Sequence, residues 1–193
     1  MKVLGITGGI GSGKSVVSNL LKIIGVPVYN SDVEAKKITA SSLLVQKKIS
    51  EKFGSQLYSE GELNKALFAS LIFNNPNHLA FANSVIHPEV YADFLEWKKK
   101  HSSCIIVGIE SAILFESGFN KYVDTSVSVS SELELRIQRV QKRDALDRIS
   151  ILNRMNNQMS EITRNLQSDY TIINDDIQAV LPQVEKLLKQ IES

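Results

Sequence analysis

The chain has 193 residues, 43% of them hydrophobic and 22% charged, and its 22 Lys and Arg against 21 Asp and Glu give a net charge of +1. This composition is that of a globular protein with a full core, and it excludes a disordered or fibrous chain. The balanced charge argues against dedicated binding to nucleic acid or to a membrane, so neither is expected as a partner. Cys104 is the single cysteine and can form no intrachain disulfide. No apolar run approaches about 18 residues, so we expect a cytoplasmic protein.

Short apolar segments alternate with helical patterns along the chain. Continuous apolar runs predict buried strands over residues 3–7, 26–29, 104–109 and 170–173. Within 123–129, valines and a threonine alternate with polar residues, which predicts a strand with one exposed face. Strands separated by helices predict an α/β fold, a P-loop NTPase-type parallel sheet of about five strands with helices on both faces.

Amphipathic helices are predicted near both ends of the chain. The first covers residues 14–24, where apolar positions recur at helical spacing and Gly25 follows as a stop. The last covers residues 177–191, and Ile177 begins its apolar stripe. Pro182 inside this stripe either kinks the helix or delays its start.

A long helical stretch separates the second and third strands. It has about 70 residues, far more than one crossover between parallel strands needs. We therefore predict a single domain with a helical insertion at 33–103 and a lid at 139–165. The remaining residues, 1–32, 104–138 and 166–193, form the core. Residues 131–165 are charged and amide-rich, which predicts a solvent-facing flap rather than a core element.

Residues 8–15, with the sequence GGIGSGKS, match the phosphate-binding pattern G-x-x-x-x-G-K-[ST] in full. They also lie between a predicted strand and a predicted helix, as this loop requires. The glycines let the backbone curl so that its N–H groups point at phosphate oxygens. Lys14 then reaches the β- and γ-phosphates, and the Ser15 hydroxyl ligates Mg²⁺. The complete motif in this context outweighs the alternative of a glycine-rich turn that binds nothing.

Two classes of phosphate-loop protein compete at this point, kinases and GTP-dependent switches. The switches recognise guanine with N-K-x-D and sense the γ-phosphate with D-x-x-G. The chain contains no D-x-x-G, and in residues 120–124 the aspartate comes one position too late. A small kinase needs instead a carboxylate facing the acceptor hydroxyl, a segment that holds the acceptor, and mobile arginines.

Asp32 directly follows the second predicted strand. In an open parallel sheet, that end of the strands is where ligands bind. A carboxylate there can take the proton of the acceptor hydroxyl and orient its oxygen. Alternatively, Asp32 is the N-cap of a helix that starts near Val33, which is the commoner role of an aspartate after a strand. Position alone does not separate the two roles.

All six arginines lie between residues 136 and 164, and positive charge elsewhere is lysine. The planar guanidinium suits phosphate oxygens better than an ammonium does. Arg136, Arg139 and Arg143 share one helical face and predict phosphate contacts. A solvated helix face paired with nearby glutamates is the alternative, and we expect two or three of the six to be functional. Arg148 and Arg164 are expected to tolerate lysine.

The sequence resembles the dephospho-coenzyme A kinase family over nearly its whole length. Residues 5–15 are similar to the extended phosphate loop of that family, and Val28 to Asp32 resembles its second-strand D-A-D segment. The further similar segments are 61–73, His87-Pro88, 114–116, the lid residues Arg139, Arg143, Asp144, Arg154 and Gln158, and 168–174.

The resemblance implies a kinase that transfers the ATP γ-phosphoryl group to the ribose 3′-hydroxyl of dephospho-coenzyme A, with ATP and Mg²⁺ as cofactors. It implies Asp32, Lys14 and Arg143 as catalytic residues. The implied ATP contacts are Gly9, Gly11, Ser12, Gly13, Lys14, Ser15, Val16, Arg139 and Asn174. The implied acceptor contacts are Thr7, Asp32, Lys65, His87, Leu114 and Phe115. A nucleoside or nucleotide kinase and a non-catalytic nucleotide-binding regulator are the alternatives, and we expect a monomer.

Some positions depart from the family pattern. Asn64-Lys65 replaces Asp-Arg, so Lys65 is only a candidate for the arginine's contact with the acceptor. Asn30 replaces the first Asp of the D-A-D segment. Ala112 stands where the family has a proline, and Val16 stands where it has a threonine.

Two further residues have two interpretations each. Glu110 ends a buried strand, where phosphate-loop proteins place a carboxylate that holds a Mg²⁺-bound water, so Ser15 and Glu110 are the candidate metal residues. An exposed strand-end charge is the alternative for Glu110. His87 precedes Pro88, which predicts a helix boundary there; it is either structural or faces the acceptor.

Overall fold

The computed structural model describes residues 1–59 and 61–192. The chain divides into two compact units, one made of Met1–Asn30 and His101–Ser193 and the other of Ser31–Lys100. They are called unit 1 and unit 2, respectively. None of the helices in the described residues is both long enough and apolar enough to cross a membrane.

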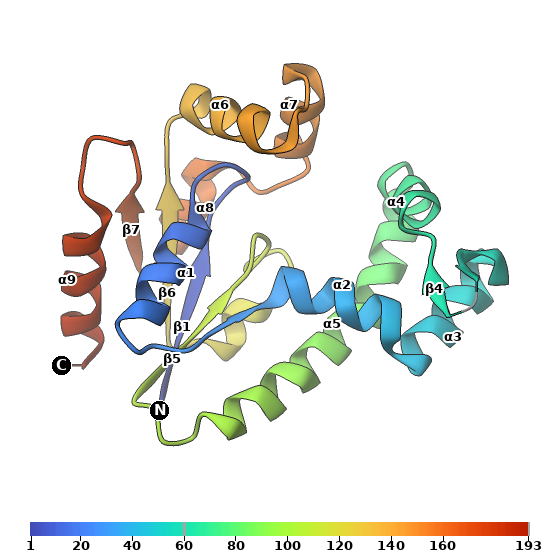
Figure 1. Ribbon diagram of the computed structural model, residues 1–193, viewed down its shortest axis with the longest axis horizontal. Helices are drawn as coiled ribbons and strands as arrows, with labels where there is room; N and C mark the ends of the chain where they lie inside the picture. The colour runs from blue at the N-terminus through green and yellow to red at the C-terminus, as the bar shows by residue number, and fades with distance from the viewer. Residues whose placement is uncertain (60, 193) are drawn as a thin grey trace. The chain divides into compact units, whose positions relative to one another are not determined.

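Unit 1 is built on a five-stranded parallel sheet in the order β2-β5-β1-β6-β7 (Figure 1). Its strands are β1 (Lys2–Thr7), β2 (Val28–Asn30), β5 (Ile106–Glu110), β6 (Thr125–Ser130) and β7 (Tyr170–Ile173). The central strand β1 is therefore followed by residues 8–13 at the carboxyl end of the sheet. The predicted α/β class and parallel sheet are confirmed, with the second and third strands shifted by one or two residues.

The helices of unit 1 lie between these strands in the chain, except the last, which follows β7. They are α1 (Lys14–Ile23), the short turn η2 (Phe119–Tyr122), α6 (Leu133–Asp144), α7 (Arg148–Asn156), α8 (Glu161–Gln167) and α9 (Val180–Glu192). Helix α1 ends where Gly25 takes a φ of 92°, a left-handed conformation that glycine adopts without strain.

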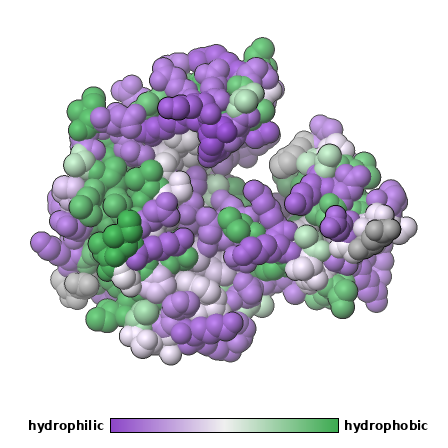
Figure 2. Space-filling view, in the orientation of Figure 1, coloured by the Kyte–Doolittle hydropathy of each residue, from purple (hydrophilic) through white to green (hydrophobic). Residues whose placement is uncertain are grey.

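The main core of unit 1 lies between the sheet and the helices α1 and α9. Val17 and Leu21 of α1 and Val184 and Leu187 of α9 are buried against the apolar side chains of β1 and β6. Each such side chain stabilises the fold by roughly 1.5–3 kcal/mol. Figure 2 shows hydrophobic residues also on the outer surface over α1 and α9, where Ile23 is among the exposed ones.

The prediction that one face of β6 is exposed is wrong. Ser126 and Ser128 are buried, as are the valines on the other face. Asp169 accepts hydrogen bonds from the backbone and the hydroxyl of Ser126, both at 2.7 Å, and Asn165 accepts one from the Ser128 hydroxyl at 2.7 Å. These partners satisfy the serines, so the alternation of polar residues marks hydrogen bonds inside the fold rather than a solvated face.

The last helix starts three residues later than its apolar stripe predicts. Helix α9 begins at Val180, so Pro182 stands in its first turn, where the missing N–H has no helical partner in any case. Ile177 lies outside the helix and is 88% exposed. Asp175 accepts hydrogen bonds from the backbone N–H groups of Ile177 and Gln178, which form a turn before the helix.

Residues 131–165 are not simply a solvent-facing flap. Ile137 and Val140 of α6 and Ile151 of α7 form a small hydrophobic core of their own. Two arginines of this segment, Arg136 and Arg164, are also buried. The outer surface over α6 and α7 is nevertheless mainly hydrophilic (Figure 2).

Unit 2 consists mostly of helices. They are α2 (Ser31–Ser41), α3 (Leu43–Phe53), α4 (Lys65–Phe73) and α5 (Pro76–Lys100), with the turn η1 (Ser55–Leu57) and a small antiparallel pair of β3 (Tyr58–Ser59) and β4 (Glu62–Leu63). Ser42 and Asn64 cap α3 and α4 by accepting hydrogen bonds from the first-turn N–H groups of Val45 and Leu67.

Helix α5 passes through His87-Pro88 without ending, so the predicted helix boundary is wrong. A proline inside a helix removes one backbone hydrogen bond. The buried side chains of Val85, Ile86 and Val90 on either side of it pack in the core of the unit and offset that loss.

Candidate active site

The phosphate loop, residues 8–15, joins β1 to α1 at the carboxyl edge of the sheet. Gly11 and Gly13 have φ angles of 80° and 91°. A Cβ at Gly11 would lie 2.5 Å from the carbonyl oxygen of Arg136, and one at Gly13 would lie 2.0 Å from Nδ2 of Asn174. The two glycines are therefore required by both conformation and space.

Lys14 is the first residue of α1, and its ammonium folds back over the loop. Its Nζ donates hydrogen bonds to the carbonyl oxygens of Gly8, at 2.7 Å, and Gly9, at 3.2 Å. Ser15 and Val16, the next two residues, are exposed at the start of the helix. The helix N-terminus adds its partial positive charge at the same place, so the loop suits an anion.

Two hydroxyl groups beside the loop are buried and have no hydrogen-bond partner within the described residues. They are Oγ1 of Thr7, at the end of β1, and Oγ of Ser12, inside the loop. A buried hydroxyl without a partner costs free energy, so such groups suit a site that binds a polar ligand. These two hydroxyl groups and the glycine-rich backbone of the phosphate loop fit the phosphates of a nucleotide.

Glu110 and Asn174 both lie at the carboxyl edge of the sheet, at the ends of β5 and β7, with β1 and β6 between those strands. Glu110 ends β5 and is buried beside β1, where it is paired in register with Ile6. This burial removes the alternative of an exposed strand-end charge. Together with Ser15 it remains a candidate for holding a divalent cation. In the part of the chain that the structure describes, no three His, Cys, Asp or Glu side chains gather as a metal site.

Asn174 is buried directly after β7 and is tied to the phosphate loop. Its Nδ2 donates to the carbonyl oxygen of Ser12 at 2.9 Å, and its backbone N–H donates to the carbonyl of Ser130 at 2.9 Å. The Ser131 hydroxyl donates to the Asn174 carbonyl at 2.8 Å. Asn174 thus holds the loop against the ends of β6 and β7.

The arginines of the predicted lid have different environments. Arg139 donates hydrogen bonds to the Ser131 hydroxyl at 3.0 Å and to Asp176. The exposed Arg143 makes a double hydrogen bond to its neighbour Asp144, at 2.7 and 2.8 Å. This bond raises the pKa of Arg143 and lowers the pKa of the Asp144 carboxyl.

Arg148 and Arg164, the two arginines expected to tolerate lysine, have different environments. Arg148 is exposed and pairs with Glu134 at 2.6 Å. The Arg164 residue is 1% exposed and donates a hydrogen bond to the carbonyl of Met159. Burial lowers the pKa of Arg164. Arg164 is therefore a core residue, and its burial argues against the expectation that it tolerates lysine.

Leu114 and Phe115 lie in the loop after β5. Leu114 is fully buried, and a Cβ at Gly5 would lie 2.8 Å from its side chain, so it packs directly on β1. Phe115 is half-buried.

Three predicted residues, Asp32, Lys65 and His87, belong to unit 2. Asp32 lies in the first turn of α2, which begins at Ser31, so it is inside the helix and is not the N-cap. Lys65 is the exposed first residue of α4. His87 is half-buried in α5, and burial lowers its pKa.

A network at the tip of the phosphate loop was not predicted. Gln158 and Arg136 bind the backbone of Ile10, and Glu161 supports Arg136. Their separation from Ile10, 126 and 148 residues for Arg136 and Gln158, leaves no local sequence pattern that could reveal the contacts.

Comparison with known proteins agrees with this geometry. A family model described as dephospho-CoA kinase matches residues 2–179. A dephospho-CoA kinase of Bacteroides fragilis (strain YCH46) is 44% identical over 186 residues, which are 96% of this chain and 90% of that protein. One of Porphyromonas gingivalis (strain ATCC BAA-308 / W83) is 38% identical over 194 residues, covering 100% of this chain and 96% of that protein.

Solved structures share the fold. The crystal structure of TT1252 from Thermus thermophilus has a TM-score of 0.83 at 30% identity and covers 98% of this chain and 95% of its own. A shikimate kinase from Acinetobacter baumannii, with a TM-score of 0.54 and 18% identity over 99% of this chain and 93% of its own, shares the fold alone. From the family match over most of its length and its relatives' identity, the chain belongs to the dephospho-CoA kinase family.

Proposed function

We propose that this protein transfers the γ-phosphoryl group of ATP to the ribose 3′-hydroxyl of dephospho-coenzyme A, giving coenzyme A and ADP in the last step of coenzyme A biosynthesis. The observation that carries the proposal is the complete phosphate loop at the carboxyl end of β1 in a chain of this family. We further propose that it works as a monomer in the cytoplasm.

The nucleotide is proposed to bind on the phosphate loop. The N–H groups of Gly9, Gly11 and Gly13, the buried hydroxyl of Ser12 and the start of α1, including Val16, would surround its phosphates. Lys14 would neutralise their charge. Arg139 in α6 and Asn174 directly after β7 are candidates for contacts with the rest of the nucleotide. Catalysis in this scheme is positioning and charge neutralisation.

Mg²⁺ is proposed to accompany ATP, and when bound it would neutralise phosphate charge. Ser15 would hold it through its hydroxyl, and Glu110 through a water. Both lie at the carboxyl edge of the sheet, Ser15 in the first turn of α1 and Glu110 as the last residue of β5. An exposed serine hydroxyl and a buried carboxylate are the oxygen donors that Mg²⁺ prefers.

Asp32 is proposed to take the proton of the acceptor hydroxyl and orient its oxygen for attack. The acceptor is proposed to bind through Thr7, Lys65, His87, Leu114 and Phe115, in part on the helical insertion at 33–103. The segment 139–165 would close as a lid, with Arg143 neutralising the transferring group, and would exclude water that could otherwise accept it.

A coupled assay of ADP release tests the proposal across dephospho-coenzyme A, nucleosides and nucleoside monophosphates. Turnover with dephospho-coenzyme A above all others is the expected result. Preference for a nucleoside or a nucleoside monophosphate would replace the proposed acceptor, and no turnover with any of them would leave a nucleotide-binding regulator.

A further inference from the structure

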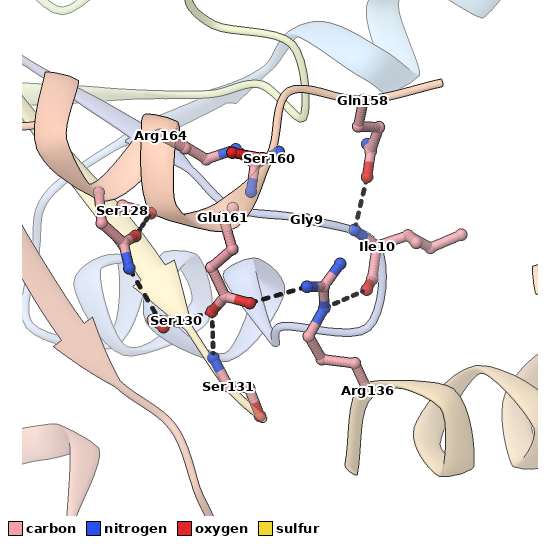
Figure 3. Close-up of polar contacts among 12 residues, drawn as sticks. Gly9, Ile10, Ser128, Ser130, Ser131, Arg136, Gln158, Ser160, Glu161 and Arg164 are labelled. Carbon is pink, nitrogen blue, oxygen red and sulfur yellow. Dashed lines mark hydrogen bonds and ion pairs between the residues drawn. The ribbon is translucent and has the colours of Figure 1, made fainter. Parts of the chain in front are cut away.

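The backbone of Ile10, at the tip of the phosphate loop, is bound on both sides by side chains from distant parts of unit 1. Oε1 of Gln158 accepts a hydrogen bond from the Ile10 N–H at 2.9 Å. Nε of Arg136 donates one to the Ile10 carbonyl oxygen at 3.0 Å. Figure 3 shows both residues pointing at the Ile10 backbone, Gln158 from one side and Arg136 from the other.

These two contacts set the orientation of two successive peptide groups. In a trans peptide the C=O and the following N–H point in opposite directions. With the Ile10 carbonyl held toward Arg136, the N–H of Gly11 points away from Arg136. With the Ile10 N–H held toward Gln158, the Gly9 carbonyl points away from Gln158, and it accepts hydrogen bonds from Ser12 at 3.1 Å and from Lys14 at 3.2 Å.

Arg136 is itself held in place. It is buried, and its Nη1 lies 2.9 Å from Oε2 of Glu161. The other oxygen of Glu161 accepts hydrogen bonds from the backbone of Ser131, at 3.0 Å, and from the hydroxyl of Ser130. The guanidinium is therefore tied to the end of β6 and the start of α8, and its charge is matched by a carboxylate.

Gln158 stands on a similarly fixed segment. The backbone N–H of the next residue, Met159, donates to Oε1 of Glu116 at 2.9 Å, and the Met159 carbonyl accepts from the buried Arg164. The Gln158 N–H donates to the Met155 carbonyl at 3.0 Å. The side-chain amide thus extends from a hydrogen-bonded turn between α7 and α8.

The fit between Arg136 and the loop is close. A Cβ at Gly9 would lie 2.3 Å from Nη2 of Arg136. The loop and the arginine therefore occupy adjoining space with no room for an added methyl group, so the position of one restricts the other.

We propose that Gln158 and Arg136 are positioning residues for phosphoryl transfer, which hold the Ile10 peptides so that the Gly11 N–H faces the nucleotide phosphates. The inference rests on the proposed function for its kinase readout. Neither residue contacts reacting atoms in this scheme; both act through the loop backbone. Preorganised N–H donors stabilise phosphate charge without reorganisation, so a loop free to turn its peptides would bind and react less well.

Gln158→Met tests the first contact because it keeps the length of the side chain and removes the strong acceptor. We expect a similar melting temperature, an ATP dissociation constant raised by roughly 10-fold and a kcat lowered by a similar factor. Gln158→Glu keeps an oxygen acceptor for the Ile10 N–H and should retain more of kcat at saturating ATP than Gln158→Met does. Wild-type binding and kcat in Gln158→Met, or equal kcat losses in the two variants, would overturn the role.

Arg136→Met tests the second contact, but it leaves Glu161 without its partner and can destabilise the fold. The double variant Arg136→Met/Glu161→Gln removes both charges, so it should recover the melting temperature of wild type. We expect its kcat to stay reduced by roughly 10-fold or more. A double variant with wild-type kcat and ATP affinity would show that Arg136 serves stability alone.

Arg148→Met is the matched control. It removes an arginine of the same segment whose salt bridge to Glu134 is exposed. Neither ATP binding nor kcat should change. All variants are compared by calorimetric titration with MgATP in the absence of acceptor, as well as by turnover. If the wild-type protein binds ATP but does not phosphorylate dephospho-coenzyme A, the proposed function fails while the ATP affinities still decide this inference.

Discussion

Asn174 donates its side-chain amide to the carbonyl of Ser12 at 2.9 Å, across 162 residues of sequence. The residue was predicted to contact ATP, and its amide is engaged with the phosphate loop itself. The loop is therefore held from two directions, by Asn174 at its inner turn and by Gln158 and Arg136 at its tip. Asn174 thereby links the end of β7 to the nucleotide site.

Asn174→Ala should lower both stability and activity. The substitution removes the buried hydrogen bond to the Ser12 carbonyl, which should lower the unfolding free energy by about 1–3 kcal/mol. The KM for ATP should rise because the loop loses one support. Urea denaturation and steady-state kinetics measure the two effects. Asn157→Ala is the control, since Asn157 is exposed at the end of α7, and it should change neither quantity by a similar amount.

The parts of the fold that the sequence predicts well are those encoded within a few adjoining residues. The phosphate loop is one contiguous motif, and the strand at 170–173 is one apolar run whose predicted bounds coincide with β7. The prediction of an exposed face on β6 is wrong because the hydrogen-bond partners of its serines are distant in sequence. Asp169 lies 43 residues from Ser126, and Asn165 lies 37 residues from Ser128.

In the candidate site, too, the sequence predicts the contiguous motif but does not predict contacts between distant residues. Side chains that bind the loop from α6 and from the turn before α8 act across more than a hundred residues, and nothing in the spacing of Arg136 or Gln158 indicates Ile10 as a partner. Confinement of the arginines to one segment indicates a shared role, but burial separates them. Arg164 lies in the core, and Arg148 lies at the surface.

Arg164→Lys should destabilise the protein, contrary to what its lack of a motif predicts. The lysine side chain is shorter, so its ammonium cannot reproduce the hydrogen bond that Arg164 donates to the Met159 carbonyl at this buried position. The unfolding free energy should fall by about 1–3 kcal/mol. Arg148→Lys, whose salt bridge is exposed, should change it by much less. Denaturation curves for the two variants measure this contrast, and equal small effects would contradict the structural role.

Asp32→Asn should separate catalysis from helix stability. Asp32 lies in the first turn of α2 but is not its N-cap, so the substitution removes no cap and weakens the charge–dipole interaction with the helix by roughly 0.3–1 kcal/mol. Activity should fall by roughly 10²-fold or more if Asp32 accepts the hydroxyl proton.

Glu34→Gln is the matched control for Asp32→Asn because Glu34 lies in the same turn and forms an exposed pair with Lys37 at 2.8 Å. It should leave kcat unchanged. Thermal melting and ADP release are measured on both variants. An Asp32→Asn protein that melts earlier but keeps its activity per folded molecule would assign the residue to stability.

His87 should make unfolding pH-dependent. Burial lowers its pKa below the ordinary 6.5, so below that value the unfolded chain binds a proton that the folded chain does not. Its contribution to stability is therefore present above the ordinary pKa and is lost as pH falls through the lower, folded value. Urea denaturation between about pH 7 and about pH 5 should show a steeper loss for wild type than for His87→Gln. Parallel curves for the two proteins would contradict it.

Lys14→Ala should leave a folded protein whose turnover is reduced by about 10²-fold or more, because a positioned phosphate-neutralising charge is lost. Lys22→Ala is the control: Lys22 is an exposed lysine in the last turn of the same helix, far along α1 from the loop. Circular dichroism checks the fold, and ADP release measures turnover. A folded Lys14→Ala protein with near wild-type kcat would refute the nucleotide site.

Arg143 offers a test of the lid. Its double hydrogen bond to Asp144 lies at the surface and holds the guanidinium in one orientation, and breaking it costs little there. If Arg143 neutralises the transferring phosphoryl group, the planar fork matters most in the transition state. Arg143→Lys keeps the charge and should therefore lower kcat more than it raises the KM for ATP.

Arg148→Lys separates this effect from a general change in the lid. Both arginines are exposed, both are paired with a carboxylate, and both variants keep the net charge. Steady-state kinetics at varied ATP should show a reduced kcat for Arg143→Lys and no change for Arg148→Lys. Equal small effects at the two positions would mean that Arg143 belongs to a solvated helix face. A guanidinium that contacts the phosphoryl group cannot be replaced by an ammonium without a loss in kcat.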